Sequence, residues 1–389
     1  MKNIRFLSLL VLPLTLTGCV ANAPSGGDTA ADSNAPIEVT ITDDTCEVST
    51  SEVPSGRVNF RLTNKGNVRN EFEILAPDKL RIVGERENLG PGTTTDYTVL
   101  LEPGEYVTAC KKNMVGSLVG DKPFTVTQGE AVDVSADEQQ AIDDAVTNYT
   151  AYVKDQTGQL LEATKEFAAA YAAGDTEKAK ALYAPSRMFY ERIEPTAEAF
   201  GDIDPALDER EADYQKADDT EGREWTGWHK AEKDLWDTPL TAEERKETAD
   251  QLVADTQKLY DLVYSDEFSI NIDDISNGAI SLLEEVATTK ITGEEEAFSH
   301  TDLYDFQANL EGAKVAYGNV ESLAKKKDPE LAETISARID ALQQNLDKHK
   351  SGNGYVSYTD LDDAQRRELS DLVDALRVPL AKLTEAIVS

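Results

Sequence analysis

The hydrophobic period of this chain changes once, and that change limits its possible folds more than any other feature. Between residues 37 and 128, apolar and polar residues alternate in short runs such as 58–62 (VNFRL) and 71–75 (EFEIL). A period of two places successive side chains on opposite faces of a strand. From residue 138 onward, apolar residues recur at steps of three and four, as they do from Ile142 to Tyr171. That period is typical of helices with one buried face.

Turn signals divide each half into elements. In the first half, PSG at 54–56, NKGN at 64–67 and PG at 91–92 and 103–104 separate the alternating runs, which predicts a small antiparallel β-sandwich. Residues 129–137 are acidic and rich in small residues, and we interpret them as a linker. The region 138–389 contains breaks at 201–208, 237–241, 266–278 and 350–355, which predicts an all-α double bundle of about eight helices.

The first 18 residues have the pattern of a targeting segment. Lys2 and Arg5 precede a short apolar run at 6–16, and the run ends in LTGC at 16–19. This ending resembles the bacterial lipobox, which implies cleavage before Cys19 and acylation of its sulfur; the alternative is a coincidental cysteine. Residues 19–36 have the composition of a flexible tether. We therefore expect an extracytoplasmic protein, anchored by lipid to the bacterial cell membrane or held in the periplasm.

The charge balance excludes one class of partner. The chain has 74 Asp and Glu against 38 Lys and Arg, a net charge of −36, and the charge is −38 without the two basic residues of the leader. A protein this acidic does not bind nucleic acid or an anionic membrane surface through charge. The excess of acidic residues favours a site that attracts cations, although many of these residues lie on solvated helix surfaces.

The segment 224–236 contains all three tryptophans and one of the three histidines. In a helix, His229 and Glu232 are three residues apart and lie on one face. Such a pair supplies two ligands to a transition metal, as Glu-x-x-His pairs do in ferritin-like bundles. The simpler interpretation is a half-buried histidine that is hydrogen-bonded to its neighbour. Asp255 and Glu285 are our candidates for further ligands from other helices, followed by Glu198 and the run 294–296 with His300, where acids at a helix start also stabilise the helix dipole.

The two cysteines of the first half have two possible roles. Outside the cytoplasm Cys46 and Cys110 form one disulfide or serve as ligands for a soft metal. Because residues 37–128 contain no histidine, the sequence excludes a blue-copper centre with two histidine ligands. The carboxylates available in this half are Glu71, Glu73, Glu85 and Glu87.

Several blocks of the first half resemble the cupredoxin-like domain of EfeO-type iron-uptake proteins. They are Cys46, 53–56 (VPSG), 70–75 (NEFEIL), 84–88 (GEREN), 91–92 (PG) and 103–106 (PGEY). The resemblance implies a metal site among Cys46, Glu71 and Cys110. The protein as a whole is expected to bind iron, and the sequence leaves open whether copper or zinc is the metal of this domain; the alternative to a metal site is a disulfide with the carboxylates on the surface.

The helical half resembles the imelysin family. The matching blocks are 184–187 (APSR), 193–202 (IEPTAEAFGD), 225–233 (WTGWHKAEK), 283–287 (LEEVA), 290–296 (KITGEEE) and 299–309 (SHTDLYDFQAN). The third block contains the Gly-x-His-x-x-Glu motif of the family. With the lipobox and the β domain in front, the whole mature chain resembles EfeO-type lipoproteins. The resemblance implies an iron-binding component that works with an iron permease and a haem peroxidase.

Two other functions remain as alternatives. Imelysins are also classed as peptidases, but the common zinc peptidases need His-Glu-x-x-His, and here position 233 is lysine. No nucleophile–histidine arrangement stands out either, so we expect no enzyme activity. A redox protein that changes the oxidation state of iron before transfer is the third possibility.

Overall fold

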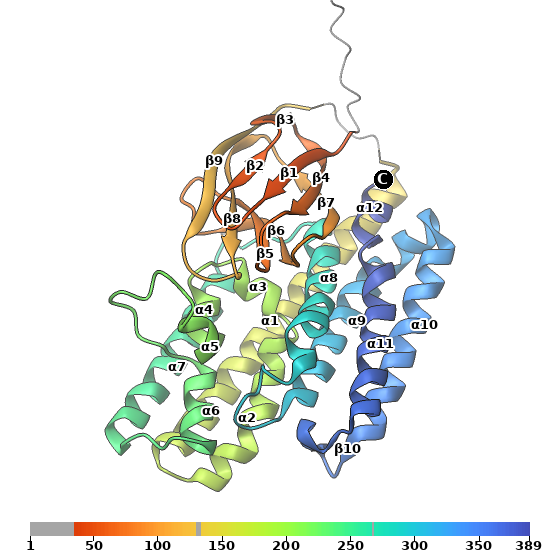
Figure 1. Cartoon of the computed structure of the whole chain (residues 1–389). Helices are drawn as coiled ribbons and strands as arrows, with labels where there is room; N and C mark the ends of the chain where they lie inside the picture. The colour runs from red at the N-terminus through yellow and green to blue at the C-terminus, as the bar shows by residue number, and fades with distance from the viewer. Residues whose placement is uncertain (1–34, 130–133, 267) are drawn as a thin grey trace, which may run out of the picture. The chain divides into compact units, whose positions relative to one another are not determined.

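A computed structural model describes residues 35–129, 134–266 and 268–389. Strands occupy the first of these ranges and helices dominate the others, so the predicted fold class of a β-sandwich followed by an all-α domain is confirmed (Figure 1). The leader, Cys19 and nearly all of the tether lie outside the described residues. No helix in the described ranges has both the length and the apolar character that a membrane crossing needs.

The β domain consists of two sheets. One has the strand order β2-β1-β4-β7 and the other β3-β9-β8-β5-β6. Most neighbours are antiparallel, but β1 pairs with β4, and β3 with β9, in parallel. The strands are β1 Ile37–Ile41, β2 Cys46–Val48, β3 Glu52–Pro54, β4 Gly56–Asn64, β5 Asn70–Leu75, β6 Ile82–Leu89, β7 Thr94–Leu101, β8 Gly104–Lys112 and β9 Leu118–Thr127.

Aromatic side chains from both sheets form the core of the sandwich. Phe60 of β4 lies 5.2 Å from Phe72 of β5 and 6.1 Å from Phe124 of β9, measured between ring centroids. A disulfide between Cys46 of β2 and Cys110 of β8 links the two sheets across this core, with 5.7 Å between the Cα atoms. The two sulfurs are therefore bonded to each other, and the expected role of Cys46 and Cys110 as metal ligands is wrong, because a ligand sulfur has to be a free thiolate.

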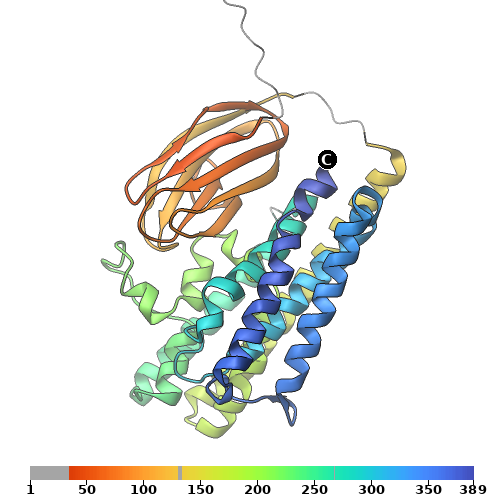
Figure 2. The same cartoon turned by 45° about the vertical axis from the view of Figure 1, so that its right-hand side comes forward.

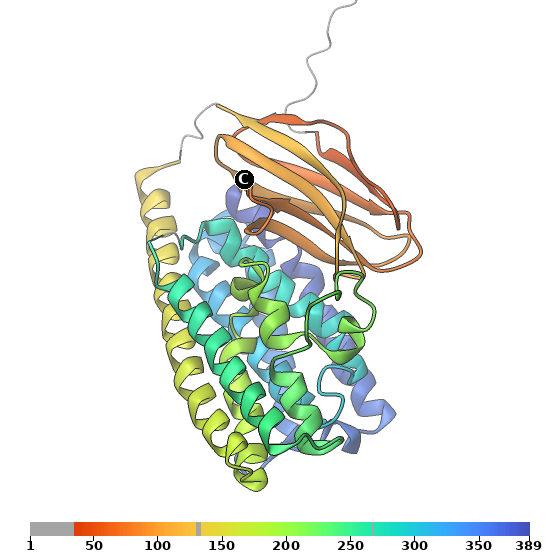
Figure 3. The same ribbon diagram turned by 90° about the vertical axis from the view of Figure 1, so that its left-hand side faces the viewer.

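The helical domain has one continuous hydrophobic core. Its longer helices are α1 Ala136–Ala172, α2 Thr176–Glu191, α7 Ala242–Val263, α8 Ile272–Thr288, α9 Asp302–Lys327, α10 Pro329–Leu346 and α11 Asp363–Leu380. The long helices α1, α9, α10 and α11 lie side by side (Figure 2), and α7 packs along α1 (Figure 3). Thr241 and Glu244 form the capping box that their spacing indicates.

Shorter elements connect these helices. They are α3 Glu194–Glu198, α4 Ile203–Asp208, α5 Glu211–Tyr214, α6 Trp228–Trp236, η1 Lys290–Thr292, η2 Asp347–His349, β10 Lys350–Ser351, β11 Gly354–Tyr355, η3 Tyr358–Asp360 and α12 Leu383–Val388. The segment from α3 to α6 interrupts the regular bundle between α2 and α7. Polar side chains from this segment converge on α2, which creates the site described below.

The β domain contacts helix α8. Residues 36–389 form one compact unit, in which the Leu100 N–H donates to Asp273 at 2.8 Å and the Ser281 hydroxyl donates to Glu87 at 2.8 Å. Arg86 of β6 pairs with Glu284 of α8, and both side chains are buried. These contacts place the carboxylates of β5 and β6 near the helical segment that follows α2.

Candidate metal centre

A glycine positions the helix that contains the predicted His-x-x-Glu pair. Helix α6 begins at Trp228, and Gly227 caps it with φ 87° and ψ −168°. A Cβ at Gly227 would lie 2.2 Å from the Leu207 carbonyl oxygen, so only glycine fits here. Trp228 is fully buried against Phe167, with 4.9 Å between ring centroids. The motif glycine thus lets α6 approach α4 closely enough for their side chains to meet.

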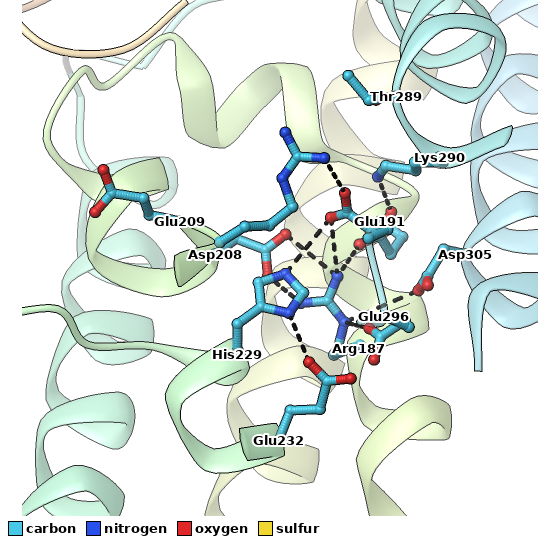
Figure 4. Close-up of polar contacts among 12 residues, drawn as sticks. Arg187, Glu191, Asp208, Glu209, His229, Glu232, Thr289, Lys290, Glu296 and Asp305 are labelled. Atoms are coloured by element: carbon cyan, nitrogen blue, oxygen red, sulfur yellow. Dashed lines mark hydrogen bonds and ion pairs between the residues drawn. The ribbon is translucent and has the colours of Figure 1, made fainter. Parts of the chain in front are cut away.

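His229 is buried, with 1% of its surface exposed, and its two ring nitrogens face carboxylates. Nδ1 lies 3.2 Å from Glu232 Oε2, in hydrogen-bond contact. Nε2 makes no hydrogen bond within the described residues, but it lies 3.5 Å from Glu295 Oε1. It also lies 3.7 Å from Asp208 Oδ1 (Figure 4). When Nδ1–H donates to Glu232, Nε2 presents its lone pair to these two acids, which is the orientation of a metal-binding histidine.

Two groups of potential ligands share His229. In one, ligand atoms of Asp208, His229 and Glu295 lie within 4.8 Å of one another, and in the other the same holds for His229, Glu232 and Glu296. All five side chains are buried. Imidazole nitrogen with carboxylate oxygens is a donor set that suits iron, and distances of this size allow a bound ion to draw the ligands together.

The turn before α9 contributes to both groups. Glu232 Oε1 accepts hydrogen bonds from the N–H groups of Phe298 at 2.9 Å and Ser299 at 2.7 Å. The Ser299 hydroxyl donates to Glu296 at 2.7 Å. Because helix α9 begins only at Asp302, the acids at 294–296 do not lie in its first turn, and the helix-dipole explanation for them is wrong.

Arg187 of α2 lies in the middle of these acids. Its guanidinium is fully buried and pairs with Asp208, with Glu191 at 2.5 Å and with Glu296 at 2.8 Å (Figure 4). Asp305 of α9 lies 3.9 Å from Arg187 Nε. Glu295 lies 3.7 Å from Arg187 Nη2, so one arginine contacts five of the carboxylates that surround His229.

The acids outnumber the cations in this interior. Six buried carboxyl groups surround His229 and Arg187: Glu191, Asp208, Glu232, Glu295, Glu296 and Asp305. Burial, reinforced by neighbouring acids, raises the pKa of Glu296 and of Asp305 well above the usual values. Burial and Arg187 oppose the imidazolium form of His229, but the neighbouring carboxylates of Asp208, Glu232 and Glu295 outweigh them, so its pKa is well above 6.5. Without a metal, protons balance this excess of acid, and a cation can take their place.

A second acidic group lies next to the first and contains the predicted Glu285. Lys290 Nζ, fully buried, lies 2.5 Å from Glu191, 3.0 Å from Glu194 and 3.4 Å from Glu285. Burial raises the pKa of Glu285 to about 8. Glu198 belongs to the same group as Glu194 and Glu285. Glu285 is therefore near the candidate centre, but it meets Lys290 rather than His229.

A cavity of about 540 Å³ connects the acidic groups. Its walls include Asp208 and Glu295 from the His229 groups and Glu194, Glu198 and Glu285 from the group around Lys290. Glu73 and Lys111 of the β domain line it as well. A hydrated cation in this cavity would reach the ligands on the open side of His229.

A further acidic group, apart from those around His229 and Lys290, lies on β5 and β6. Glu71, Glu73 and Glu85 offer oxygens within 4.8 Å of one another, and Lys111 Nζ lies 3.3 Å from Glu71 and 2.8 Å from Glu73. Burial raises the pKa of Glu71 well above its usual value. The predicted ligand Glu71 thus meets other acids instead of Cys46 and Cys110.

Asp255 is the predicted ligand that the fold keeps away from the centre. It belongs to none of the ligand groups found in the described ranges, and it accepts a hydrogen bond from Gln251 at 2.9 Å. The buried stripe of α7 runs through Leu252, Thr256 and Leu259, and Asp255 lies at its edge, half-buried. The structure therefore does not bring Asp255 into a ligand group with His229.

Sequence reasoning missed Asp208, Glu191 and Arg187. Arg187 lies inside the matched block 184–187, and Asp208 lies just after the block 193–202, but neither has a spacing that relates it to His229. Glu295 and Glu296 were visible only as members of an acidic run. These residues are recognised as part of the site only because the fold brings them together.

Comparisons with known proteins agree with both halves of the architecture. The family described as Peptidase_M75, imelysin, matches residues 145–383, and the cupredoxin-like domain family matches residues 8–119. The chain is 40% identical over 350 residues to proteins named iron uptake system component EfeO from Escherichia coli K12 and from Shigella flexneri. Each alignment covers 89% of this chain and 90% of the relative.

Proposed function

This chain belongs to the imelysin family and to the family of iron uptake system component EfeO, and from that premise we propose that it binds iron outside the cytoplasm as part of an iron uptake system. In this proposal a permease and a haem peroxidase are its partner components. Lipid on Cys19 holds it at the membrane. The iron is cargo, which the protein captures and then releases.

The observation that carries the proposal is the open nitrogen of a buried histidine. His229 Nε2 makes no hydrogen bond in the described part of the chain and faces Glu295 and Asp208 at 3.5 and 3.7 Å. A metal ion placed between Nε2 and these two carboxylates would take the place of the proton that the surrounding acids hold on the ring. We propose His229 with Glu232 as the centre of the ligand set, with Asp208, Glu295 and Glu296 completing it.

We propose a second, separate cation site in the β domain, formed by Glu71, Glu73 and Glu85. With both cysteines in a disulfide, this site has oxygen ligands alone. Oxygen ligands suit hard cations, such as ferric iron, better than the softer copper(I), which prefers sulfur. Glu73 belongs to this group and also lines the cavity whose walls include Asp208 and Glu295. An ion released from the β-domain site would therefore enter the space that leads to His229.

Binding, rather than peptide cleavage, fits the helical site. The position where a zinc peptidase places its second histidine is Lys233, and its ammonium lies 2.6 Å from both oxygens of Glu211. The ammonium group of Lys233 thus pairs with Glu211, which belongs to none of the ligand groups around His229. Casein cleavage by the purified protein that disappears in Glu232→Gln would overturn this part of the proposal.

Iron titration of matched variants tests the main site. We expect His229→Ala and Glu232→Gln each to lose one bound ion when ferrous iron is added anaerobically or ferric iron as its citrate complex. Asp255→Asn and His349→Ala serve as controls, because each removes the same type of group outside the site, and both should bind like the wild type. Unchanged stoichiometry and affinity in the His229 and Glu232 variants would reject the assignment.

The β-domain site has its own test. Glu73→Gln should remove a second ion and leave the one at His229 in place. A mature protein that binds a single ion, and loses it fully in His229→Ala, would contradict the second site.

A further inference from the structure

We propose that Arg187 is a built-in competitor for the bound ion: its guanidinium holds the ligand oxygens when no metal is present and yields them when a metal enters. The inference rests on the proposed function of the His229 site and adds how that site releases its cargo. Arg187 would limit affinity and speed dissociation.

The geometry shows that one pair of oxygens faces both the guanidinium and the imidazole. Asp208 Oδ1 pairs with Arg187 and lies 3.7 Å from His229 Nε2. Glu295 Oε1 lies 3.7 Å from Arg187 Nη2 and 3.5 Å from His229 Nε2. An ion bound by His229 Nε2 and these oxygens would stand next to a fixed positive charge that uses the same lone pairs.

The site also contains a place to which the guanidinium can move. Asp305 lies 3.9 Å from Arg187 Nε, is 1% exposed, and its Oδ2 makes no hydrogen bond among the residues that the structure describes. Arg187 Nε itself has no hydrogen bond of good geometry there. Glu296 already contacts Nε at 2.8 Å, on the edge of the guanidinium that faces Asp305, and Glu191 contacts Nη2 at 2.5 Å. A small shift toward Asp305 would keep Arg187 paired while it frees Asp208 and Glu295.

A purely supporting role for Arg187 predicts the opposite result from a competing role. If Arg187 only organised the ligands, its removal would loosen the site and weaken metal binding. If it competes, its removal leaves Asp208 and Glu295 uncompensated and ready for the ion, so binding tightens. The direction of the change therefore separates the two roles.

The experiment compares iron affinity and release in the full mature chain. Release is followed by transfer of iron to a chelator in stopped flow. We expect Arg187→Gln to bind iron about tenfold or more tightly, a difference of about 1.4 kcal/mol per factor of ten, and to release it correspondingly slowly. Arg187→Lys, which keeps the charge, should lie between this variant and the wild type.

Arg192→Gln is the matched control, because Arg192 pairs with Glu311 at 2.8 Å and contacts none of the ligand oxygens. It should behave like the wild type. Weaker or unchanged binding in Arg187→Gln, with the ion still lost in His229→Ala, would overturn the competitor role and leave the proposed function standing. A wild-type protein with no ion at His229 would overturn the function itself.

A structure of the iron-loaded wild type tests the same idea if Arg187→Gln does not fold. We expect Arg187 to lie more than about 4 Å from Asp208 and Glu295, beyond ion-pair contact, and to approach Asp305. An iron-loaded site with the Arg187–Asp208 pair intact would overturn the inference.

Discussion

Replacing Gly227 by alanine is expected to damage both stability and metal binding, for two separate reasons. The backbone at Gly227 has φ 87° and ψ −168°, a region that is nearly restricted to glycine. The new Cβ would also lie 2.2 Å from the Leu207 carbonyl oxygen and 2.5 Å from its carbon, both backbone atoms. Neither contact can be relieved by a side-chain rotation.

The structure sets the size of each effect. The backbone strain alone costs about 1–3 kcal/mol. An ordinary carbon–oxygen contact is about 3.3 Å, so α4 and α6 must separate by about 1 Å. Asp208 follows Leu207 directly, and His229 follows Gly227 by two residues, so this separation moves Asp208 away from His229 Nε2. We expect iron affinity to fall about 10- to 100-fold, as it does when groups supporting a ligand are disturbed.

Gly222→Ala is the control for this experiment. Gly222 has a similar φ of 84°, but a Cβ there would meet nothing within 4 Å. Urea unfolding and iron titration of both variants should show a loss of stability in each, larger in Gly227→Ala, and a loss of affinity in Gly227→Ala alone. Equal iron affinity in Gly227→Ala and wild type would refute the argument that this glycine positions His229.

Three further predictions concern the rest of the molecule. Cys46→Ser with Cys110→Ser should lower stability by about 4 kcal/mol, the loop entropy for a separation of 64 residues, without removing a bound ion; loss of an ion would restore the cysteines as ligands. Burial raises the pKa of Asp273 to about 6 from 3.8, so its stabilising contribution is complete below pH 4 and lost as the pH rises through 6. Asp273→Asn should remove this pH-dependent loss of stability, which amounts to up to about 3 kcal/mol. Urea unfolding at several pH values checks this, and the same pH dependence in variant and wild type would contradict the prediction. Arg86→Met should cost up to about 3–5 kcal/mol, because Glu284 stays buried with only the longer, 3.5 Å ion pair to Arg377. The double variant with Glu284→Met should recover most of this loss, and no recovery would refute the pairing argument.

The sequence by itself determined the elements and one pair of candidate ligands. The change from a period of two to a period near 3.6 separates strands from helices, because each period reflects how neighbouring residues alternate between core and solvent. The spacing of His229 and Glu232 places them on one helix face for the same local reason. The structure has Glu232 within 3.2 Å of Nδ1, as that spacing requires.

Only the tertiary structure decided what surrounds that pair. Asp208 and Glu295 come from segments 21 residues before and 66 residues after His229, and no local pattern relates them to it. Asp255 was a candidate ligand from another helix, but the core-facing stripe of α7 leaves it at the edge. Likewise, Cys46 and Cys110 meet because two sheets pack face to face. Local periodicity follows from backbone geometry, whereas the convergence of distant charges depends on how helices and sheets pack, and a local sequence pattern carries no record of that packing.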